Sequence, residues 1–296
     1  MKRINSIFAG LGLLVAGSLS AQTPAEADTS ATVRDYKVEV YEKENIPFKK
    51  PIPYAYVREA DVMFEKIVWR MVDLREKRNL PLYYPTANIG SRVNLVNLLL
   101  RGVESGEVTA YTTNDVNNEF VQPMTLEELD TQFDIQETVI EAMDEDGEMI
   151  QTVIKKDRAD RLPEITRLLI KEKIYFDKKH SVLNRRVIGI CPIRYYHQNE
   201  DDPESEMVMK KIMWVYVPEA RNILARHPVF NRFNDAQNIS FDDFLMQNRY
   251  DGYIFQISNV YNNRAIQEYA AGLDVLYEAQ RIENEIFDFE QDLWEY

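Results

Sequence analysis

The residue types that most often carry enzyme chemistry are few in this chain of 296 residues. It contains three histidines, His180, His197 and His227, and a single cysteine, Cys191. The histidines lie in unrelated stretches without the HExxH spacing of a zinc protease, and one cysteine cannot anchor a zinc site. Cys191 lies in an apolar run, where a buried and inert thiol is expected, because a nucleophilic thiol needs an exposed, electropositive setting. We therefore predict no metal site, no cofactor and no catalytic residue.

Carboxylates are abundant and are the remaining candidates for acid and base chemistry. Asp242 and Asp243 are adjacent, and the C-terminal end of the chain is strongly acidic. Paired carboxylates at the start of a helix act more often as caps and as partners of the helix dipole than as an acid/base pair. The two carboxylates of a glycosidase need not be neighbours in the chain, however. A hydrolase that uses two carboxylates therefore stays open as an alternative, and so does a small-molecule binding module with an apolar cleft.

The first residues predict an exported protein. Basic residues stand at positions 2 and 3, an apolar run follows at residues 7–19, and small residues suited to cleavage lie at 18–22. This order is that of a secretory signal peptide, which we place at residues 1–21. The apolar run is shorter than the roughly 20 residues of a transmembrane helix. We therefore predict that the chain works in the periplasm, as would the hydrolase or binding module named above.

Neither a lipid anchor nor a nucleic-acid partner is expected. Ala21 and Gln22 stand where a bacterial lipoprotein would need a cysteine. The formal net charge is -14, and removal of the two basic residues of the signal peptide brings it to -16. Such a charge is a poor match for nucleic acid and for an anionic lipid surface. With one cysteine, the chain also forms no internal disulfide, so it must be stabilised by burial of apolar side chains or by partners.

Residues 22–53 are expected to form an extended, partly disordered N-terminal arm. Their composition is polar and poor in large aliphatic side chains, which is typical of weakly ordered segments. Residues 36–41 alternate between polar and apolar types and could add an edge strand. Prolines at positions 47, 51 and 53 then favour an extended backbone. The arm would lie either on its own body or on a neighbouring molecule.

The rest of the chain, residues 54–296, is predicted to be a single body rich in amphipathic helices. Apolar side chains recur at helical spacing between residues 54 and 78, and a second helix is expected at 91–104, with Ser91 as its cap and Gly106 beyond its end. Further helices are predicted to start at the capping box of Thr125 and at Ser240, and another at residues 163–173. Residues 272–294 are predicted to form a long, acidic C-terminal helix.

Strands are predicted in three places. Residues 135–142 and 149–154 flank a glycine-containing turn and are expected to form a β-hairpin. Residues 186–193 and 207–217 are expected to pair as long strands, and residues 253–257 form a short strand rich in β-branched and aromatic residues. Helices and antiparallel hairpins without a regular βαβ alternation predict an α+β fold, with long amphipathic helices packed on hairpins.

Tyrosine is unusually frequent, with 17 Tyr and 3 Trp on an acidic chain. Aromatic side chains are enriched at protein interfaces, where they bury a large area at low entropic cost. Most of them are expected to pack in the core or at its rim. Aromatic side chains that do not pack in the core favour an assembly subunit over an enzyme.

Several segments together resemble one known family. They are READVM at 58–63, WRMVDLREK at 69–77, LPLYYP at 80–85, VPEAR at 217–221, VFNR at 229–232, SFDD at 240–243 and FDFEQDLWEY at 287–296. Each segment alone is short, but their order and their spread over nearly the whole mature chain resemble the gliding motility protein family GldN / PorN of Bacteroidetes.

The resemblance implies a structural role in the type IX protein secretion system. Members of that family lie in the periplasm at the inner face of the outer membrane and form a ring with a lipoprotein of the PorK/GldK type. They are also described as contacting the periplasmic region of the inner-membrane motor protein PorM/GldM. The family offers no catalytic or cofactor residues to carry over. The absence of a lipid-attachment cysteine agrees with this role, because the lipoprotein partner would supply the membrane anchor.

Overall fold

The computed structural model describes residues 48–293 except 87–88, 90–91, 114–118, 136, 144–148, 156–157, 198–206, 232–233, 235 and 237–238. The predicted signal peptide and the predicted strand at residues 36–41 lie outside the described residues. Of the predicted arm, residues 48–53 are described.

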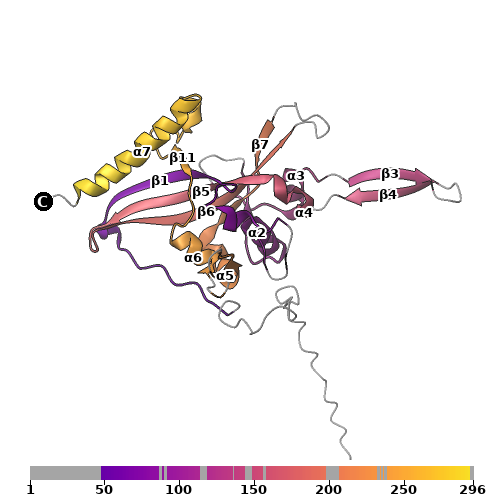
Figure 1. The fold of residues 1–296 in the computed structure, drawn as a ribbon, viewed down its shortest axis with the longest axis horizontal. Helices are drawn as coiled ribbons and strands as arrows, with labels where there is room; N and C mark the ends of the chain where they lie inside the picture. The colour runs from indigo at the N-terminus through magenta and orange to yellow at the C-terminus, as the bar shows by residue number, and fades with distance from the viewer. Residues whose placement is uncertain are drawn as a thin grey trace, which may run out of the picture.

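A seven-stranded antiparallel sheet forms the centre of the molecule (Figure 1). Its strands run in the order β11-β1-β5-β6-β8-β2, and β7 pairs with β6 beside this path. The bounds are β1 (Val62–Asp73), β2 (Ala110–Tyr111), β5 (Ile165–Asp177), β6 (Val182–His197), β7 (Met207–Lys211), β8 (Trp214–Tyr216) and β11 (Tyr253–Ile257). Two small sheets pair β3 (Glu137–Met143) with β4 (Met149–Lys155) and β9 (Pro228–Val229) with β10 (Ile239–Ser240).

Helices surround this sheet and confirm the α+β class. They are α1 (Leu80–Tyr83), α2 (Leu95–Glu104), α3 (Leu126–Gln132), α4 (Arg158–Arg161), α5 (Val217–Arg226), α6 (Phe241–Met246) and α7 (Leu273–Asp292), with short 3-10 turns at 59–61, 162–164 and 266–268. The expectation of several long helices was wrong for the described residues, since α7 has 20 residues and the next longest, α2 and α5, have 10 each. No helix in the part of the chain that the structure describes is both long and apolar enough to cross a bilayer.

The helix predicted between residues 54 and 78 is wrong, because β1 occupies its centre. This strand pairs with β5 from Val62 to Asp73 and with β11 on its other side. Residues 68–72 are buried on both faces of the sheet, and all of them except Arg70 are apolar, so apolar side chains do not alternate with exposed polar ones. A run of this kind matches a helical spacing and a buried strand equally well, and the sheet partners decide between them.

The helix predicted at residues 163–173 is wrong for the same reason. Residues 165–177 form β5, which lies between β1 and β6 and is buried along most of its length. The strand predicted at 207–217 is interrupted: β7 and β8 form its two ends, and residue 217 begins helix α5. Pro218 stands in the first turn of that helix, where a missing N–H costs no hydrogen bond.

Most elements with local start or end signals were placed correctly, but the predicted cap Ser91 of the helix at 91–104 was wrong. Helix α2 begins after Asn94, whose side chain accepts a hydrogen bond from Asn97 N at 2.7 Å, so Asn94 is the cap in place of Ser91. The capping boxes of Thr125 and Ser240 open α3 and α6. The C-terminal helix is α7, and the predicted strands at 135–142, 149–154, 186–193 and 253–257 correspond to β3, β4, β6 and β11.

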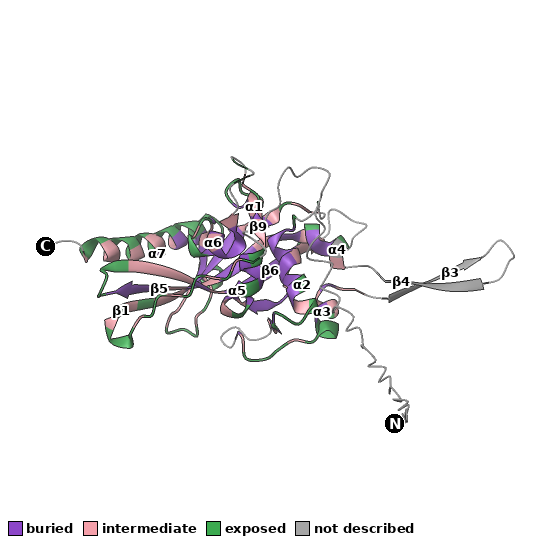
Figure 2. Ribbon diagram, turned by 90° about the horizontal axis from the view of Figure 1, so that it is seen from below, coloured by how far each residue is buried: buried purple, intermediate pink, exposed green. Residues whose placement is uncertain are grey.

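The apolar core has three clusters. The largest lies between the sheet and helices α2, α5 and α6, where Figure 2 shows buried residues concentrated. A second cluster joins Val68 and Ile174 of the sheet to Val275, Ala279 and Ile282 of α7. Because β1 and β5 are paired in register, residues 68 and 72 and residues 168, 170 and 174 point to one face. The third cluster, around Trp69 and Trp214, covers the opposite face.

Candidate functional site

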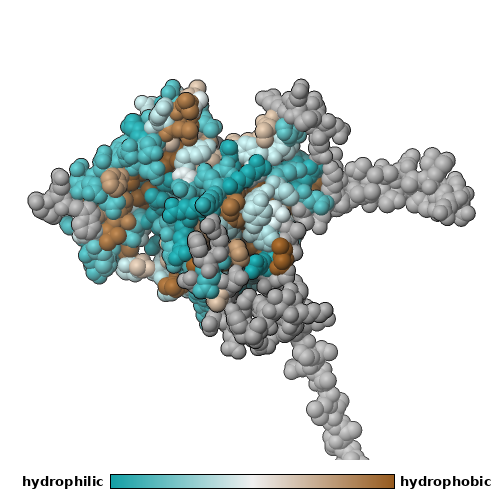
Figure 3. All heavy atoms as spheres, viewed as in Figure 1, coloured by the Kyte–Doolittle hydropathy of each residue, from teal (hydrophilic) through white to brown (hydrophobic). Residues whose placement is uncertain are grey.

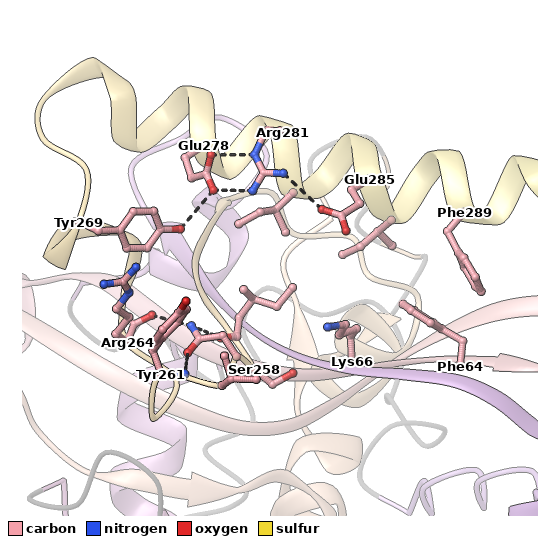
Figure 4. Close-up of a pocket in the computed structure, with 15 residues that line it drawn as sticks. Phe64, Lys66, Ser258, Tyr261, Arg264, Tyr269, Glu278, Arg281, Glu285 and Phe289 are labelled. Atoms are coloured by element: carbon pink, nitrogen blue, oxygen red, sulfur yellow. Dashed lines mark hydrogen bonds and ion pairs between the residues drawn. The ribbon is translucent and has the colours of Figure 1, made fainter.

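A groove of about 530 Å³ lies between α7, the start of β1 and the segment after β11 (Figure 4). It is bounded below by β1, from which Phe64 and Lys66 reach toward α7, and above by α7 itself. The pleat places residues 64 and 66 on one face of the strand, so both side chains reach the same groove. The full lining is Phe64, Lys66, Ile257, Ser258, Asn259, Val260, Tyr261, Arg264, Tyr269, Glu278, Arg281, Ile282, Glu285, Ile286 and Phe289.

One end of the groove is apolar. The rings of Phe64 and Phe289 stack with centroids 4.2 Å apart and close the groove between β1 and the end of α7. Ile286 and Ile282 continue this wall about one and two turns earlier in the helix. The side chains at 282, 286 and 289 share a helix face because they are three or four residues apart. This end of the groove therefore suits aliphatic or aromatic side chains.

Charged side chains form the rim on α7. Arg281 donates to both oxygens of Glu278, at 2.8 and 2.6 Å, and lies 3.5 Å from Glu285. Tyr269 donates to Glu278 at 3.3 Å. The hydrogen bond from Arg281 lowers the pKa of Glu278 and outweighs the opposing effect of burial. Glu278 is therefore ionised at neutral pH, whereas a general acid needs a raised pKa.

The loop side of the groove holds a cation between two aromatic rings. The Arg264 guanidinium lies 4.7 Å from the ring centroid of Tyr261 and 4.7 Å from that of Tyr269. Asn262 and Asn263 have positive φ values of 55° and 57°, which let the loop turn tightly enough to present Arg264 between the rings. Burial, followed by Glu278, raises the pKa of Tyr269, so its hydroxyl stays protonated and donates.

Behind the groove, a cluster of buried charges connects α7 to the sheet. Arg70, which is 3% exposed, lies 3.3 Å from Glu172, which is fully buried. Arg70 also donates to the Gly252 carbonyl at 2.7 Å and to Glu283 of α7 at 3.2 Å. Tyr250 donates to Glu172 at 2.8 Å. The cluster lies between the two apolar clusters on this face and fixes the position of α7.

The protonation states in this cluster follow from burial and pairing. Burial opposes the charge of Arg70, but Glu172 and Glu283 outweigh it and raise the Arg70 pKa. Burial, reinforced by Glu172, raises the pKa of Tyr250 well above its usual value, so Tyr250 remains a donor. Nη2 of Arg70 is buried without a hydrogen-bond partner among the described residues. The buried ion pairs and hydrogen bonds of this cluster therefore hold α7 against the sheet.

The predicted burial of Cys191 is confirmed. The residue is fully buried in β6, and burial raises the pKa of its thiol to about 12. The three histidines lie in separate places: His180 in the turn after β5, His197 at the end of β6 and His227 after α5. His180 Nδ1 lies 2.5 Å from Asp177, and burial lowers the pKa of His227. Within the described ranges, no three His, Cys, Asp or Glu side chains gather as a metal site.

The adjacent carboxylates at the start of α6 have separate structural partners. Asp242 accepts from Arg221 at 2.9 and 3.0 Å. Asp243 closes the capping box with Ser240 and pairs with Lys49. Burial alone would raise the pKa of Asp243, but hydrogen bonds from Lys49 and Ser240 outweigh it and lower the pKa. Asp242 therefore acts as an ion-pair partner of Arg221, which was not predicted, and Asp243 acts in the helix cap, as its position in the sequence predicted.

The described end of the N-terminal arm lies on its own body. The Tyr54 ring lies between the guanidinium groups of Arg186 and Arg221, each 4.1 Å from its centroid. Arg221 also donates to the Ile52 carbonyl, and Lys49 reaches Asp243. Because an aromatic face attracts a cation, Tyr54, the residue directly after the predicted arm, is held against α5 and β6.

Sequence reasoning missed the groove. Its floor belongs to the segment that was predicted as a helix, in which the side chains of Phe64 and Lys66 would not share a face. Its loop residues Tyr261, Arg264 and Tyr269 follow the last strand with a spacing that matches no known motif. A strand prediction for residues 62–73 would have placed the side chains of Phe64 and Lys66 on the same face.

Comparison with known proteins relates the chain to one family. Residues 57–295 match the family described as gliding motility associated protein GldN. No curated protein matches the chain. The matched range contains the whole central sheet, the groove and α7. Since it covers far more than half of the chain, this protein belongs to the GldN family of gliding motility associated proteins.

Proposed function

We propose that this chain is a non-enzymatic structural subunit of the type IX protein secretion system. It forms a periplasmic ring with an outer-membrane lipoprotein of the PorK/GldK type and contacts the PorM/GldM motor. The observation that carries the proposal is the family match over residues 57–295, since this family is associated with gliding motility and type IX secretion. The ring and the two partners are what the family resemblance implies for this chain.

A periplasmic location is supported by the first residues. The basic pair at positions 2 and 3, the apolar run at 7–19 and the small residues at 18–22 have the order of a signal peptide. Ala21 and Gln22 leave no cysteine for acylation. A lipoprotein partner would then hold the chain, as one body from residue 54 onward, at the inner face of the outer membrane.

A non-enzymatic role is supported by the partners of the candidate residues. Cys191 is buried as a thiol, and Asp242 and Asp243 are used in an ion pair and a helix cap. Glu278 in the groove has a lowered pKa because Arg281 holds it ionised. In each case the burial or the partners of the side chain suit a role in stabilising the fold.

The test is to express the full chain together with its lipoprotein partner and to image detergent extracts of the membrane by electron microscopy. We expect rings that contain both proteins, and co-purification through a tag on either one. The lipoprotein expressed alone is the control for ring formation. A free monomer that neither co-purifies nor enters a ring would contradict the proposal.

The groove favours a small-molecule binding module as a second candidate. Its volume of about 530 Å³ lies in the range of ligand sites, about 300–1,000 Å³. A ligand that binds the folded state raises the melting temperature with its concentration. A thermal-shift screen that compares wild type with Ile286→Glu checks this, because the substitution places a charge in the apolar end of the groove.

A further inference from the structure

The solvent side of α7 carries an uncharged stripe. Leu273 is 70% exposed, Leu276 50%, Tyr277 69% and Phe287 56%. Three exposed amides complete the set. The outer stripe consists of Leu273, Leu276, Tyr277, Gln280, Asn284, Phe287 and Gln291. Successive members are one, three or four residues apart, so they lie in one continuous band.

The outer stripe lies opposite the side of α7 that packs on the sheet. Val275, Ala279 and Ile282 are buried against β1, β5 and β11, and they alternate with the stripe along the helix. Figure 3 shows hydrophobic residues on this exposed side, gathered at the start of α7. With a rise of about 1.5 Å per residue, the stripe is about 27 Å long. The helix thus has an apolar side against the sheet and an uncharged, partly apolar side opposite to it, and its own fold needs only the first.

The borders of the outer stripe are acidic. Helix α7 contains seven carboxylates, at 274, 278, 283, 285, 288, 290 and 292, and one arginine, Arg281, so its formal charge is -7 + 1 = -6. By helical position, Glu283 and Glu290 follow one border, and Asp274, Asp288 and Asp292 follow the other, where Arg281 also lies between Asp274 and Asp288. An uncharged stripe between charged borders is the pattern of a helix that pairs with another helix.

The negative charge of the borders indicates which kind of partner can bind the outer stripe. A second copy of α7 would set a charge of -6 against -6, and like charges across a helix pair are repulsive. An anionic lipid surface would be repelled as well. A partner helix with Lys or Arg beside its apolar stripe would instead find a carboxylate along both borders. Such pairs favour a correct register and fast association.

We propose that the outer stripe of α7 is the docking surface for a basic amphipathic helix of a partner protein. The apolar members contact the apolar stripe of that helix, and the acidic borders contact its lysines or arginines. The inference rests on the proposed function only in placing the partner in the same machinery. The surface itself is defined by the exposure and charge of α7.

A defined peptide tests the surface on the full chain. The probe has three heptads with Leu at positions a and d and Lys at e and g, and a matched peptide has Glu in place of Lys. We expect the Lys peptide to bind and the Glu peptide to bind at least tenfold more weakly. Leu276→Glu should weaken binding of the Lys peptide about tenfold or more, as for a central interface residue. The added negative charge would by itself strengthen attraction to lysine, so a loss reports the apolar contact.

Val121→Glu is the matched control, because Val121 is 72% exposed, lies before α3 and gains the same charge. It should leave peptide binding unchanged, and both variants should unfold at the urea concentration of wild type. Asp288→Asn with Glu290→Gln should reduce binding of the Lys peptide and flatten its salt dependence. Equal binding of the two peptides, or equal binding by Leu276→Glu and Val121→Glu, would overturn the proposal.

Two further outcomes would overturn the proposed occupant. Sedimentation that shows self-association of wild type, lost in Leu276→Glu, would identify a second copy as the occupant. Binding of wild type to vesicles with anionic lipid, lost in the same variant, would identify a membrane. Ring imaging separates this inference from the proposed function: rings in wild type with no peptide binding reject the docking surface alone. Peptide binding without rings rejects the secretion-ring role alone.

Discussion

At the scale of single residues, substitutions should destabilise the protein most at buried charged residues and at positions where the packing leaves no room for a larger side chain. Arg70 and Glu172 are both almost fully buried and depend on each other for charge compensation. Gly189 leaves room for the Phe120 ring, which packs on Trp214 and Tyr216 with ring centroids 5.7 and 5.3 Å away. Single substitutions at such positions test the packing of the sheet directly.

Arg70→Leu should destabilise the protein by about 3–5 kcal/mol, because the fully buried Glu172 loses its nearer charge partner and keeps the partly exposed Arg185, 3.6 Å away. The measurement is the free energy of unfolding from urea titration. Arg281→Leu is the control, since its side chain is 62% exposed and pairs with Glu278 at the surface. Exposed pairs contribute about 0–1 kcal/mol. Equal losses in the two variants would contradict the assignment of Arg70 as a buried connection.

Gly189→Ala should cost about 1–3 kcal/mol through overpacking. A Cβ at this position would lie 2.3 Å from Cζ of Phe120, whose ring is confined by its aromatic neighbours. Phe120→Leu removes the atom that clashes. The double variant should therefore be more stable than the sum of the two single losses predicts. Strict additivity in urea unfolding would show that the ring does not restrict this position.

At the scale of elements, caps and ion pairs decide where helices begin and what they hold. Helix α6 starts at the Ser240 capping box, and Asp243 of the same box pairs with Lys49 of the arm. Asp242 pairs with Arg221 of α5, whose guanidinium lies over Tyr54. One helix start therefore connects α6, α5 and the arm.

The capping box should make stability depend on pH in the acidic range. The pKa of Asp243 is lower in the folded state than its ordinary value, near 3.8. Its contribution to stability is therefore complete above that ordinary value and is lost as pH falls through the lower folded pKa. Below about pH 4, wild type should lose stability more steeply than Asp243→Asn, measured by urea unfolding at each pH. The exposed Asp160→Asn should keep the wild-type profile, and parallel profiles for wild type and Asp243→Asn would contradict the assignment.

At the scale of the whole molecule, one sheet carries two apolar layers on the same face. Helices α2, α5 and α6 cover the larger cluster, and α7 covers the smaller one beside β1 and β11. The buried ion pair of Arg70 and Glu172 lies between the two clusters. Arg70 also pairs with Glu283 of α7, and this contact links α7 to the sheet. Since α7 rests on fewer buried side chains, it should open separately from the rest of the sheet.

Hydrogen exchange should detect this difference. Amides of α7 should exchange at a lower opening free energy than amides of β5 and β6, which lie in the centre of the sheet. Ala279→Glu places a charge in the contact between α7 and the sheet, where Ala279 is 3% exposed, and should speed exchange in α7 but leave α2 protected. Gln280→Glu, on the exposed side, should have no such effect. Exchange of α7 and the sheet as one unit would contradict the separate opening.

The sequence alone determined the parts of the fold that carry local signals. The capping residues at 125 and 240 and the apolar spacing after Gly272 define α3, α6 and α7, because a helix start depends on the side chains within one turn of it. Seven short segments, taken in their order along the chain, were enough to relate the chain to its family, which the match over residues 57–295 confirms.

Tertiary structure alone decided the state of β1 and β5 and, with it, the groove. Residues 68–72 and most of 165–177 are buried on both faces, with the charged Arg70 and Glu172 among them, so their periodicity does not distinguish a helix from a buried strand. For β1, hydrogen bonds to β5 and β11, both more than 90 residues away, decide between the two, and that free energy is absent from any local window. For β5, the same distant pairing with β1 adds to the nearby hairpin with β6. The groove combines side chains from β1 and α7, which are about 200 positions apart in the chain. A site of this kind exists only once the sheet has brought those segments together.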